Sequence, residues 1–213
     1  MKKALAVLGV TLVCASNAWA QTAEMQLLHK FARCDAGFFN VLKEYQEDLD
    51  LYAPIEPVGS VARFQLAGNL KGEATVDFAK PMVVNGIRFT SFFSKWHKLE
   101  STDDANNHLQ RLEWGFAVDE HNTRKIAQRL PQLRLRKVDA SMMQARRYLI
   151  ENTRAGLDWK VTTEPLAVLP GRGSVEKSLI LQKYGKQHVL HCVLEGYAPA
   201  QLIKKERPDL PVF

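Results

Sequence analysis

The segment Val83–Arg88, which reads Val-Val-Asn-Gly-Ile-Arg, constrains the fold more than any other part of the chain. The Asn-Gly pair readily adopts the positive φ angles of a two-residue turn, and β-branched residues flank it on both sides. We therefore expect a β-hairpin here. Because a turn this short joins antiparallel strands, the surrounding sheet should be antiparallel as well.

Alternation of apolar and polar residues extends this sheet in both directions along the chain. The period of two residues is typical of strands with one buried face. The expected strands are 63–66, 75–78, 87–98 and 112–118, and the turns between them are 69–72 and 101–107. The first half of the chain is thus expected to contain an antiparallel meander.

The region before the meander has the spacing of a helix. Apolar residues recur at intervals of three and four, at Leu28, Phe31, Phe38, Leu42, Tyr45 and Leu49. This seam fits one face of a long helix over residues 24–50, although Asp35 interrupts it. Pro54 and Pro57 end the helix and favour extended chain after it.

The second half repeats the order of helix and then sheet. Asn122 or Thr123 can cap a short helix that Pro131 stops, and Asp139 can cap another over residues 140–152. Strands are expected at 159–163, 178–184 and 188–195, with Gly185-Lys186 as a hairpin turn. No residue-level repeat accompanies this similarity, so an ancient duplication stays open.

These patterns predict an α+β fold, in which a long N-terminal helix lies against an antiparallel β-meander and a second helix-then-sheet half follows. We expect residues 21–118 and 119–197 to form two halves docked on one another, and residues 198–213 to form a loosely held tail.

Residues 1–20 read as a signal peptide that is cleaved near Ala20. Lys2 and Lys3 precede an apolar run, and Ala18-Trp19-Ala20 supplies the small residues of a cleavage site. Removing the two lysines lowers the net charge from +6 to +4. The remaining chain has no apolar stretch of the roughly 18 residues that a membrane span needs. The sequence therefore predicts a periplasmic or secreted protein, and a branched Val13 before Cys14 disfavours lipidation.

Two cysteines, Cys34 and Cys192, remain after cleavage. An even number in an oxidising compartment favours a disulfide, which would clamp the N-terminal helix to the last strand. The alternatives are two buried thiols, or a nucleophilic cysteine with His188 or His191 as its base.

Charge is concentrated in residues 121–156, which hold nine basic residues and two acidic ones. Seven of the nine are arginine, the side chain best suited to contacts with carboxylates and phosphates. The candidate basic face consists of Arg124, Lys125, Arg129, Arg134, Arg136, Arg146 and Arg147. A solvated surface is the simpler interpretation. The functional one is binding of an acidic protein or an anionic envelope component, as in an inhibitor or immunity protein.

A second candidate site is aromatic. Phe89, Phe92, Phe93, Trp96, Trp114 and Phe116 all fall within the meander. They could pack the core, or line a cleft between helix and sheet that carries a small apolar ligand. Phe92 and Phe93 are adjacent in a strand, so they must point to opposite faces.

Motifs of known chemistry are missing from the sequence. It has no His-Glu-x-x-His, no Cys-x-x-Cys and no Gly-x-Ser-x-Gly, and His188 and His191 would lie on opposite faces of one strand. We therefore expect no metal and no cofactor, and a binding protein rather than an enzyme. A hydrolase using His121 or His188 is a weaker alternative. Nucleic acid is a poor partner, because Tyr148 is the only aromatic residue within the basic segment.

Overall fold

The computed structural model describes residues 22–99, 109–162, 170–185 and 187–211. The expected signal peptide, the turn at 101–107 and Lys186 of the Gly185-Lys186 turn lie outside these residues. Within the described part, no helix is long and apolar enough to cross a membrane.

The fold is predominantly antiparallel sheet, so the expected α+β fold with a long N-terminal helix is wrong. Residues 24–50 form three short helices: α1 (Ala23–Phe31), α2 (Gly37–Glu44) and α3 (Gln46–Leu49). The chain leaves the helical conformation at Cys34, which has a φ of +53°. Asp35 then accepts a hydrogen bond from the Gly37 N–H at 2.9 Å, which starts α2 in a new direction.

Helices α1 and α2 bury the apolar residues that the sequence pattern places on one face. Phe31 at the end of α1 and Phe38 near the start of α2 are fully buried, with ring centroids 5.3 Å apart. The apolar spacing is correct, but it is satisfied by two helices that meet at a turn. Periodicity alone does not distinguish these arrangements, because the break depends on one backbone angle and a disulfide.

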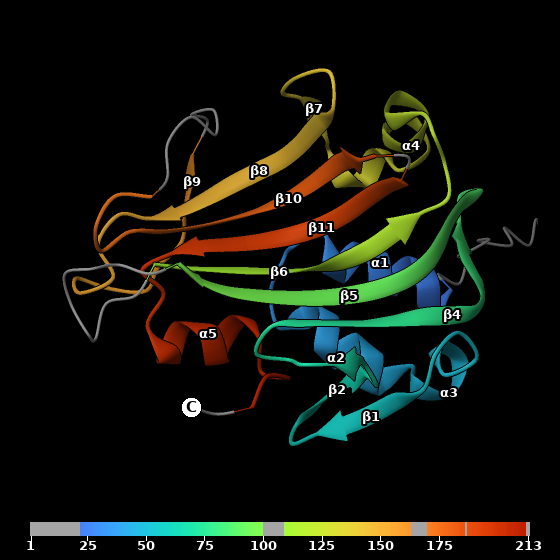
Figure 1. Ribbon diagram of the computed structural model, residues 1–213, viewed down its shortest axis with the longest axis horizontal. Helices are drawn as coiled ribbons and strands as arrows, with labels where there is room; N and C mark the ends of the chain where they lie inside the picture. The colour runs from blue at the N-terminus through green and yellow to red at the C-terminus, as the bar shows by residue number, and fades with distance from the viewer. Residues whose placement is uncertain (1–21, 100–108, 163–169, 186, 212–213) are drawn as a thin grey trace, which may run out of the picture.

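A single curved sheet of nine strands organises the molecule (Figure 1). Its strands are β3 (Ala67–Gly68), β4 (Glu73–Val84), β5 (Ile87–Leu99), β6 (Leu109–Val118), β7 (Arg136–Lys137), β8 (Met142–Ile150), β9 (Lys160–Thr162), β10 (Val175–Tyr184) and β11 (Gln187–Gly196). The order is β3-β4-β5-β6-β11-β10-β8-β7, with β9 beside β8, and every pairing is antiparallel. Because β6 pairs with β11, the two expected halves share one sheet.

The hairpin prediction is confirmed. Val84 pairs with Ile87, and Asn85 and Gly86 have φ values of +50° and +73°. The expected strands 75–78, 87–98 and 112–118 fall within β4, β5 and β6, but the expected strand 63–66 overlaps a strand of another sheet. A separate two-stranded sheet, β1 (Ile55–Val58) and β2 (Val61–Phe64), packs beside α2.

The second expected helix of the second half, residues 140–152, is instead strand β8. Asp139 accepts hydrogen bonds from Ser141 and Met142 as a helix cap would, but the turn leads into extended chain. Met, Gln, Ala and Arg are good helix formers, but intrinsic propensity amounts to less than about 1 kcal/mol per residue, and pairing with β10 overrides it. The first expected helix does form, as α4 (Thr123–Arg129).

The core lies between the sheet and helices α1 and α2, which lie behind the sheet in Figure 1. Phe116 of β6 contacts Phe31, Phe38 and Phe92 with ring centroids 4.9, 6.0 and 5.1 Å away. Burial of a large aromatic side chain contributes about 1.5–3 kcal/mol, so this cluster is a main source of stability.

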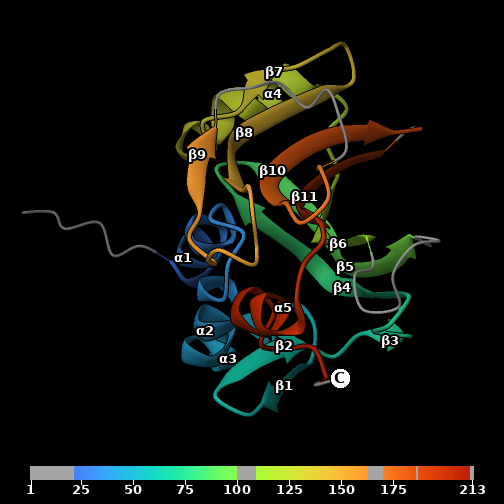
Figure 2. The ribbon, with the colours of Figure 1, turned by 90° about the vertical axis from the view of Figure 1, so that its left-hand side faces the viewer.

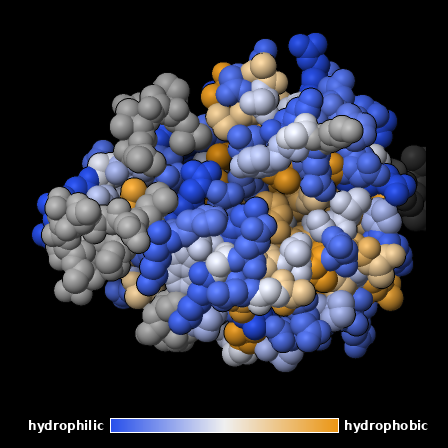
Figure 3. Space-filling view, viewed as in Figure 1, coloured by the Kyte–Doolittle hydropathy of each residue, from blue (hydrophilic) through white to orange (hydrophobic). Residues whose placement is uncertain are grey.

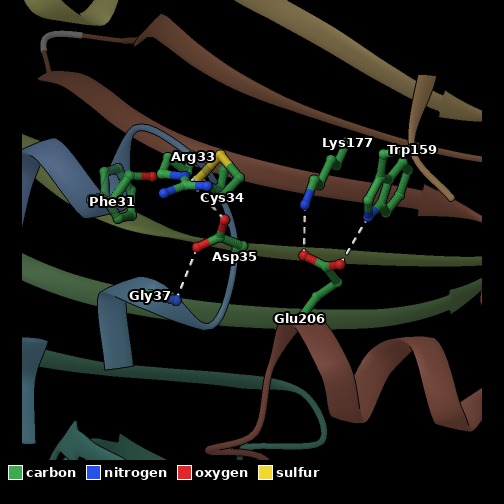
Figure 4. A network of polar contacts seen from close by, with 9 residues as sticks. Phe31, Arg33, Cys34, Asp35, Gly37, Trp159, Lys177 and Glu206 are labelled. Carbon is green, nitrogen blue, oxygen red and sulfur yellow. Dashed lines mark hydrogen bonds and ion pairs between the residues drawn. A yellow bond between two sulfur atoms is a disulfide. The ribbon is translucent and has the colours of Figure 1, made fainter. Parts of the chain in front are cut away.

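The segment after Pro199, which we expected to be loosely held, forms α5 (Ala200–Glu206) on the same side as α2 (Figure 2). Arg207 is 1% exposed, and its Nε lies 2.8 Å from Oδ1 of Asp209. The guanidinium carbon of Arg207 lies 4.8 Å from the centroid of the Trp114 ring. Glu206 is likewise buried against Lys177 and Trp159 (Figure 4). The tail is therefore held by charged groups that are paired inside the fold.

Candidate functional site

The exposed cations of α4, of the short helix η1 (Pro131–Leu133) with its C-terminal residue, and of β7 form what we call the basic edge. Its members are Arg124, Lys125, Arg129, Arg134, Arg136 and Lys137, and all six are exposed. Residues 121–137 contain no carboxylate at all. α4 and β7 both lie along the upper border of the molecule in Figure 1.

Apolar anchors hold the basic edge in place. Ile126, Leu130 and Leu133 are buried in the core. Asn122 caps α4 by accepting a hydrogen bond from the Lys125 N–H at 3.1 Å, as the sequence suggests. The amide of Asn85 donates to the Arg129 carbonyl oxygen at 3.1 Å, so the β4–β5 turn fixes the end of α4. The cations are therefore carried by a rigid scaffold.

The side chain of His188, in β11, contacts the first turn of α4. Its Nε2 is 2.8 Å from the Thr123 hydroxyl, and the side chain is on the helix-covered face of β11. Burial lowers the pKa of His188. The imidazole is therefore kept neutral below α4, and it supports that helix instead of adding to the charge of the basic edge.

Only part of the basic edge has an internal partner. Lys125 pairs with Glu120 at 2.5 Å, and Arg129 contacts the Asn85 carbonyl oxygen at 3.5 Å. Arg124, Arg134, Arg136 and Lys137 have no carboxylate within ion-pair distance among the residues that the structure describes. Four cations are thus available to an external anion.

A cavity of about 230 Å³ opens beside the basic edge, between the end of α1, η1 and β8. Its polar lining comes from His29, Arg33, Gln132, Arg134 and Tyr148. Arg33 pairs with Asp35 at 3.4 Å and is 62% exposed (Figure 4). The cavity therefore presents two guanidinium groups, a hydroxyl and an amide to a ligand, with one carboxylate nearby.

Backbone strain is concentrated at the same place. Three described residues other than glycine have positive φ angles: Cys34, Asn85 and Arg134. Cys34 follows Arg33, Asn85 holds α4, and Arg134 lines the cavity. Left-handed backbone costs about 1–3 kcal/mol at Cys34 and Arg134, whereas Asn85 adopts it readily in the hairpin turn. Here each strained residue positions a cation of this region.

Two predicted members of the basic face differ from the rest. Arg147 is 8% exposed, lies on the opposite face of the sheet, and pairs with Glu176. It follows Arg146 in β8, and the structure does not describe the Arg146 side chain. The prediction placed both residues in an exposed basic face. The strand instead places Arg147 in a buried ion pair, so it does not contribute to an external surface.

The predicted aromatic set does not form one site. Phe89, Phe92, Trp96, Trp114 and Phe116 are each at most 5% exposed and belong to the core. Phe93 points to the opposite face, as adjacency to Phe92 requires. The space between helices and sheet is filled where these five side chains lie.

The predicted disulfide is confirmed. Cys34 and Cys192 are joined with a Cα–Cα distance of 5.4 Å, so the turn between α1 and α2 is tied to β11 (Figure 4). His188 and His191 lie on opposite faces of β11. Among the described residues, no group of three His, Cys, Asp or Glu side chains could hold a metal ion.

Sequence reasoning missed a polar network on the face of the sheet opposite α1 and α2, which we call the polar face. Arg111 contacts both Glu113 and Glu195, the latter at 2.6 Å, and Nδ1 of His191 lies 3.3 Å from Oε2 of Glu113. These residues alternate with core residues in β6 and β11. The alternation was visible in the sequence, but it does not reveal which strands become neighbours.

Comparisons with family models, with curated proteins and with solved structures found no match to this chain. The site must therefore be interpreted from its own geometry.

Proposed function

We propose that this chain is an exported binding protein without catalytic activity, whose basic edge binds an acidic protein. The observation that carries the proposal is the set of four exposed cations, Arg124, Arg134, Arg136 and Lys137, without carboxylate partners in the described chain. An excess of unpaired arginine favours an anionic partner, since complementary charge accelerates encounter and selects against basic competitors.

The cavity beside the basic edge supports the same proposal. A volume of about 230 Å³ accommodates one acidic side chain or a comparable anionic group. Arg33 and Arg134 can both contact a carboxylate there, and paired contacts of this kind are stronger than single ones. The broad, exposed part of the edge would then provide attraction, and the cavity would provide geometric selection.

The disulfide supports export, because such bonds persist in oxidising compartments. A periplasmic or extracellular location agrees with the signal-like N-terminus. We do not extend the proposal to a carrier of apolar ligands, because the aromatic residues expected to line its cleft pack in the core.

The test is charge reversal at the basic edge. Arg134→Glu/Arg136→Glu changes the charge by four units at two exposed positions. The matched control, Lys204→Glu/Lys205→Glu, makes the same change on the exposed side of α5. Each immobilised protein is incubated with an envelope extract and, separately, with vesicles containing phosphatidylglycerol, at low and high salt.

We expect wild type and control to retain an acidic protein that high salt releases, and the basic-edge variant to lose it while keeping its thermal midpoint. Retention of the same partner by the basic-edge variant would refute the proposal. Binding only to the phosphatidylglycerol vesicles would identify a lipid, and not a protein, as the partner. That result would also contradict the proposal.

A further inference from the structure

The polar face contains a second cavity, larger than the first and made of different residues. It is a groove of about 440 Å³ lined from β4, β5, β6, β10 and β11. Figure 3 shows this face as mostly hydrophilic, with apolar surface at the bottom of a hollow near its centre. The volume lies within the usual range of small-molecule sites. From this groove we propose a binding site for an organic ammonium ion with an apolar body.

Small residues create the groove. Ser91, Ala117 and Val189 lie side by side in neighbouring strands, where larger side chains would fill the space. Gly115 is the next residue on this face of β6, and a Cβ added there would lie only 2.5 Å from Cβ of His191. Its absence lets the rings of Phe93 and His191 approach to 6.1 Å across β6. The floor therefore consists of small side chains, two of them apolar, and Phe93 and Tyr184 place aromatic rings in the walls.

The charges of the groove favour a cation. Glu73, Lys95 and Glu113 lie opposite one another on β4, β5 and β6, so two carboxylates flank one ammonium group. Burial alone would raise the pKa of Glu113, but His191 and Arg111 outweigh it and lower that pKa to about 2. Glu113 thus stays ionised with its charge shared with Arg111, and Glu73, which contacts only Lys95 among the described ion pairs, supplies the second carboxylate.

Lys95 already occupies the position that such a ligand would take. Its Nζ lies 2.8 Å from Oε1 of Glu73 and 5.7 Å from the centroid of Phe93. An ammonium group between a carboxylate and an aromatic ring is the arrangement by which proteins recognise organic cations. Lys95 is 34% exposed on a flexible stem, so it can move aside for a ligand.

A buried polar group beneath the groove is a second, independent observation. The His191 side chain is 0% exposed; its Nδ1 lies 3.3 Å from Oε2 of Glu113, and its Nε2 completes no hydrogen bond among the described residues. The centroid of its ring lies 6.1 Å from that of Phe93 and 6.2 Å from that of Tyr184. Both of these residues line the groove. Buried polar groups without partners are rare in folded proteins, and here one lies directly under a cavity.

The test uses three probes that share one apolar body: 2-phenylethylammonium, 3-phenylpropionate and 2-phenylethanol. Calorimetric titration at neutral pH compares them on the full mature protein. We expect the ammonium to bind most tightly, and Phe93→Leu to weaken it about threefold to fivefold, as loss of a cation–π contact implies. Glu73→Gln should weaken it as well, whereas Glu151→Gln, an exposed carboxylate outside the groove, should not.

Lys95→Met gives the decisive result, because the two possible charge preferences predict opposite effects. Removing the internal cation should tighten binding of 2-phenylethylammonium. Tighter binding of 3-phenylpropionate than of the ammonium, lost in Lys95→Met, would overturn the proposal in favour of an anion site. Absence of saturable binding for all three probes up to about 10 mM, a concentration that detects even weak sites, would also overturn it.

Discussion

At the scale of single residues, Glu113 is the most informative ionisable group. It is 9% exposed, contacts Arg111, and faces His191. Glu195 pairs with the same guanidinium group, yet its pKa is raised, mainly by burial and also by the nearby carboxylates of Glu176 and Glu113. The same arginine lowers the pKa of both carboxylates, and their other neighbours decide the direction of the net shift.

The lowered pKa of Glu113 predicts a specific pH dependence. Both the folded and the unfolded chain carry the ionised group above pH 4.5, and the unfolded chain takes up the proton first as the pH falls. The contribution of Glu113 to the free energy of unfolding is therefore fully present above about pH 4.5 and is lost as the pH falls from 4.5 to about 2. The loss should amount to about 3 kcal/mol, from 1.4 kcal/mol for each pH unit.

Urea unfolding at pH 7 and pH 3 measures this effect in wild type and in Glu113→Gln. We expect the difference between the two pH values to shrink in the variant, since it lacks the titrating group. Glu151→Gln, at an exposed carboxylate, is the control and should unfold as wild type does at both pH values. An unchanged pH dependence in Glu113→Gln would show that other groups cause the loss.

At the scale of elements, α5 depends on one buried ion pair. Nζ of Lys177 lies 2.6 Å from Oε2 of Glu206, and the Trp159 indole donates to the other oxygen at 2.8 Å. Both ionic side chains are at most 6% exposed. Glu206→Ala should cost about 3–5 kcal/mol, because it leaves the ammonium buried without its carboxylate.

The double variant Lys177→Met/Glu206→Leu separates this cause from simple loss of packing. It removes both charges while keeping apolar volume, so it should recover most of the stability that Glu206→Ala loses. Chemical denaturation monitored by tryptophan fluorescence compares the three proteins. Equal destabilisation of the single and double variants would rule out the uncompensated charge as the cause.

The disulfide acts between elements, joining the α1–α2 turn to β11. It spans 158 residues, so its loss should cost about 2–5 kcal/mol by freeing the unfolded chain. Cys34→Ala/Cys192→Ala and wild type in reductant should therefore unfold at similarly lower urea concentrations. A shift in the variant alone would indicate a packing defect at the replaced side chains.

Elements with a strong local signal were predictable from the sequence. The Asn85-Gly86 turn and the Asn122 cap were predicted correctly, because short-range geometry decides them. The break at Cys34 and strand β8 were not, since a disulfide and pairing with β10 decide those segments. The same limit applies to the candidate sites. The exposed cations of α4 were foreseeable, but the buried position of Arg147 and the groove depend on which strands become neighbours.

At the scale of the whole molecule, the two candidate sites lie on different surfaces. The basic edge carries six cations. The polar face carries Glu73, Glu113, Glu176 and Glu195, each of which lies against a cation, Lys95, Arg111 or Arg147. Such a molecule can present one surface to an anionic partner and another to a cationic ligand without competition between them.

Site-specific photocrosslinking tests the central claim most directly. A photoreactive side chain replaces Gln132, which lines the cavity beside the basic edge and carries no charge. Matched positions are Tyr184 on the polar face and Lys204 on α5. Illumination of the protein in a cell-envelope extract should yield an acidic protein crosslinked through position 132 and through neither of the others. A partner crosslinked through position 184 or 204, but not through 132, would contradict the assignment of the basic edge as the binding surface.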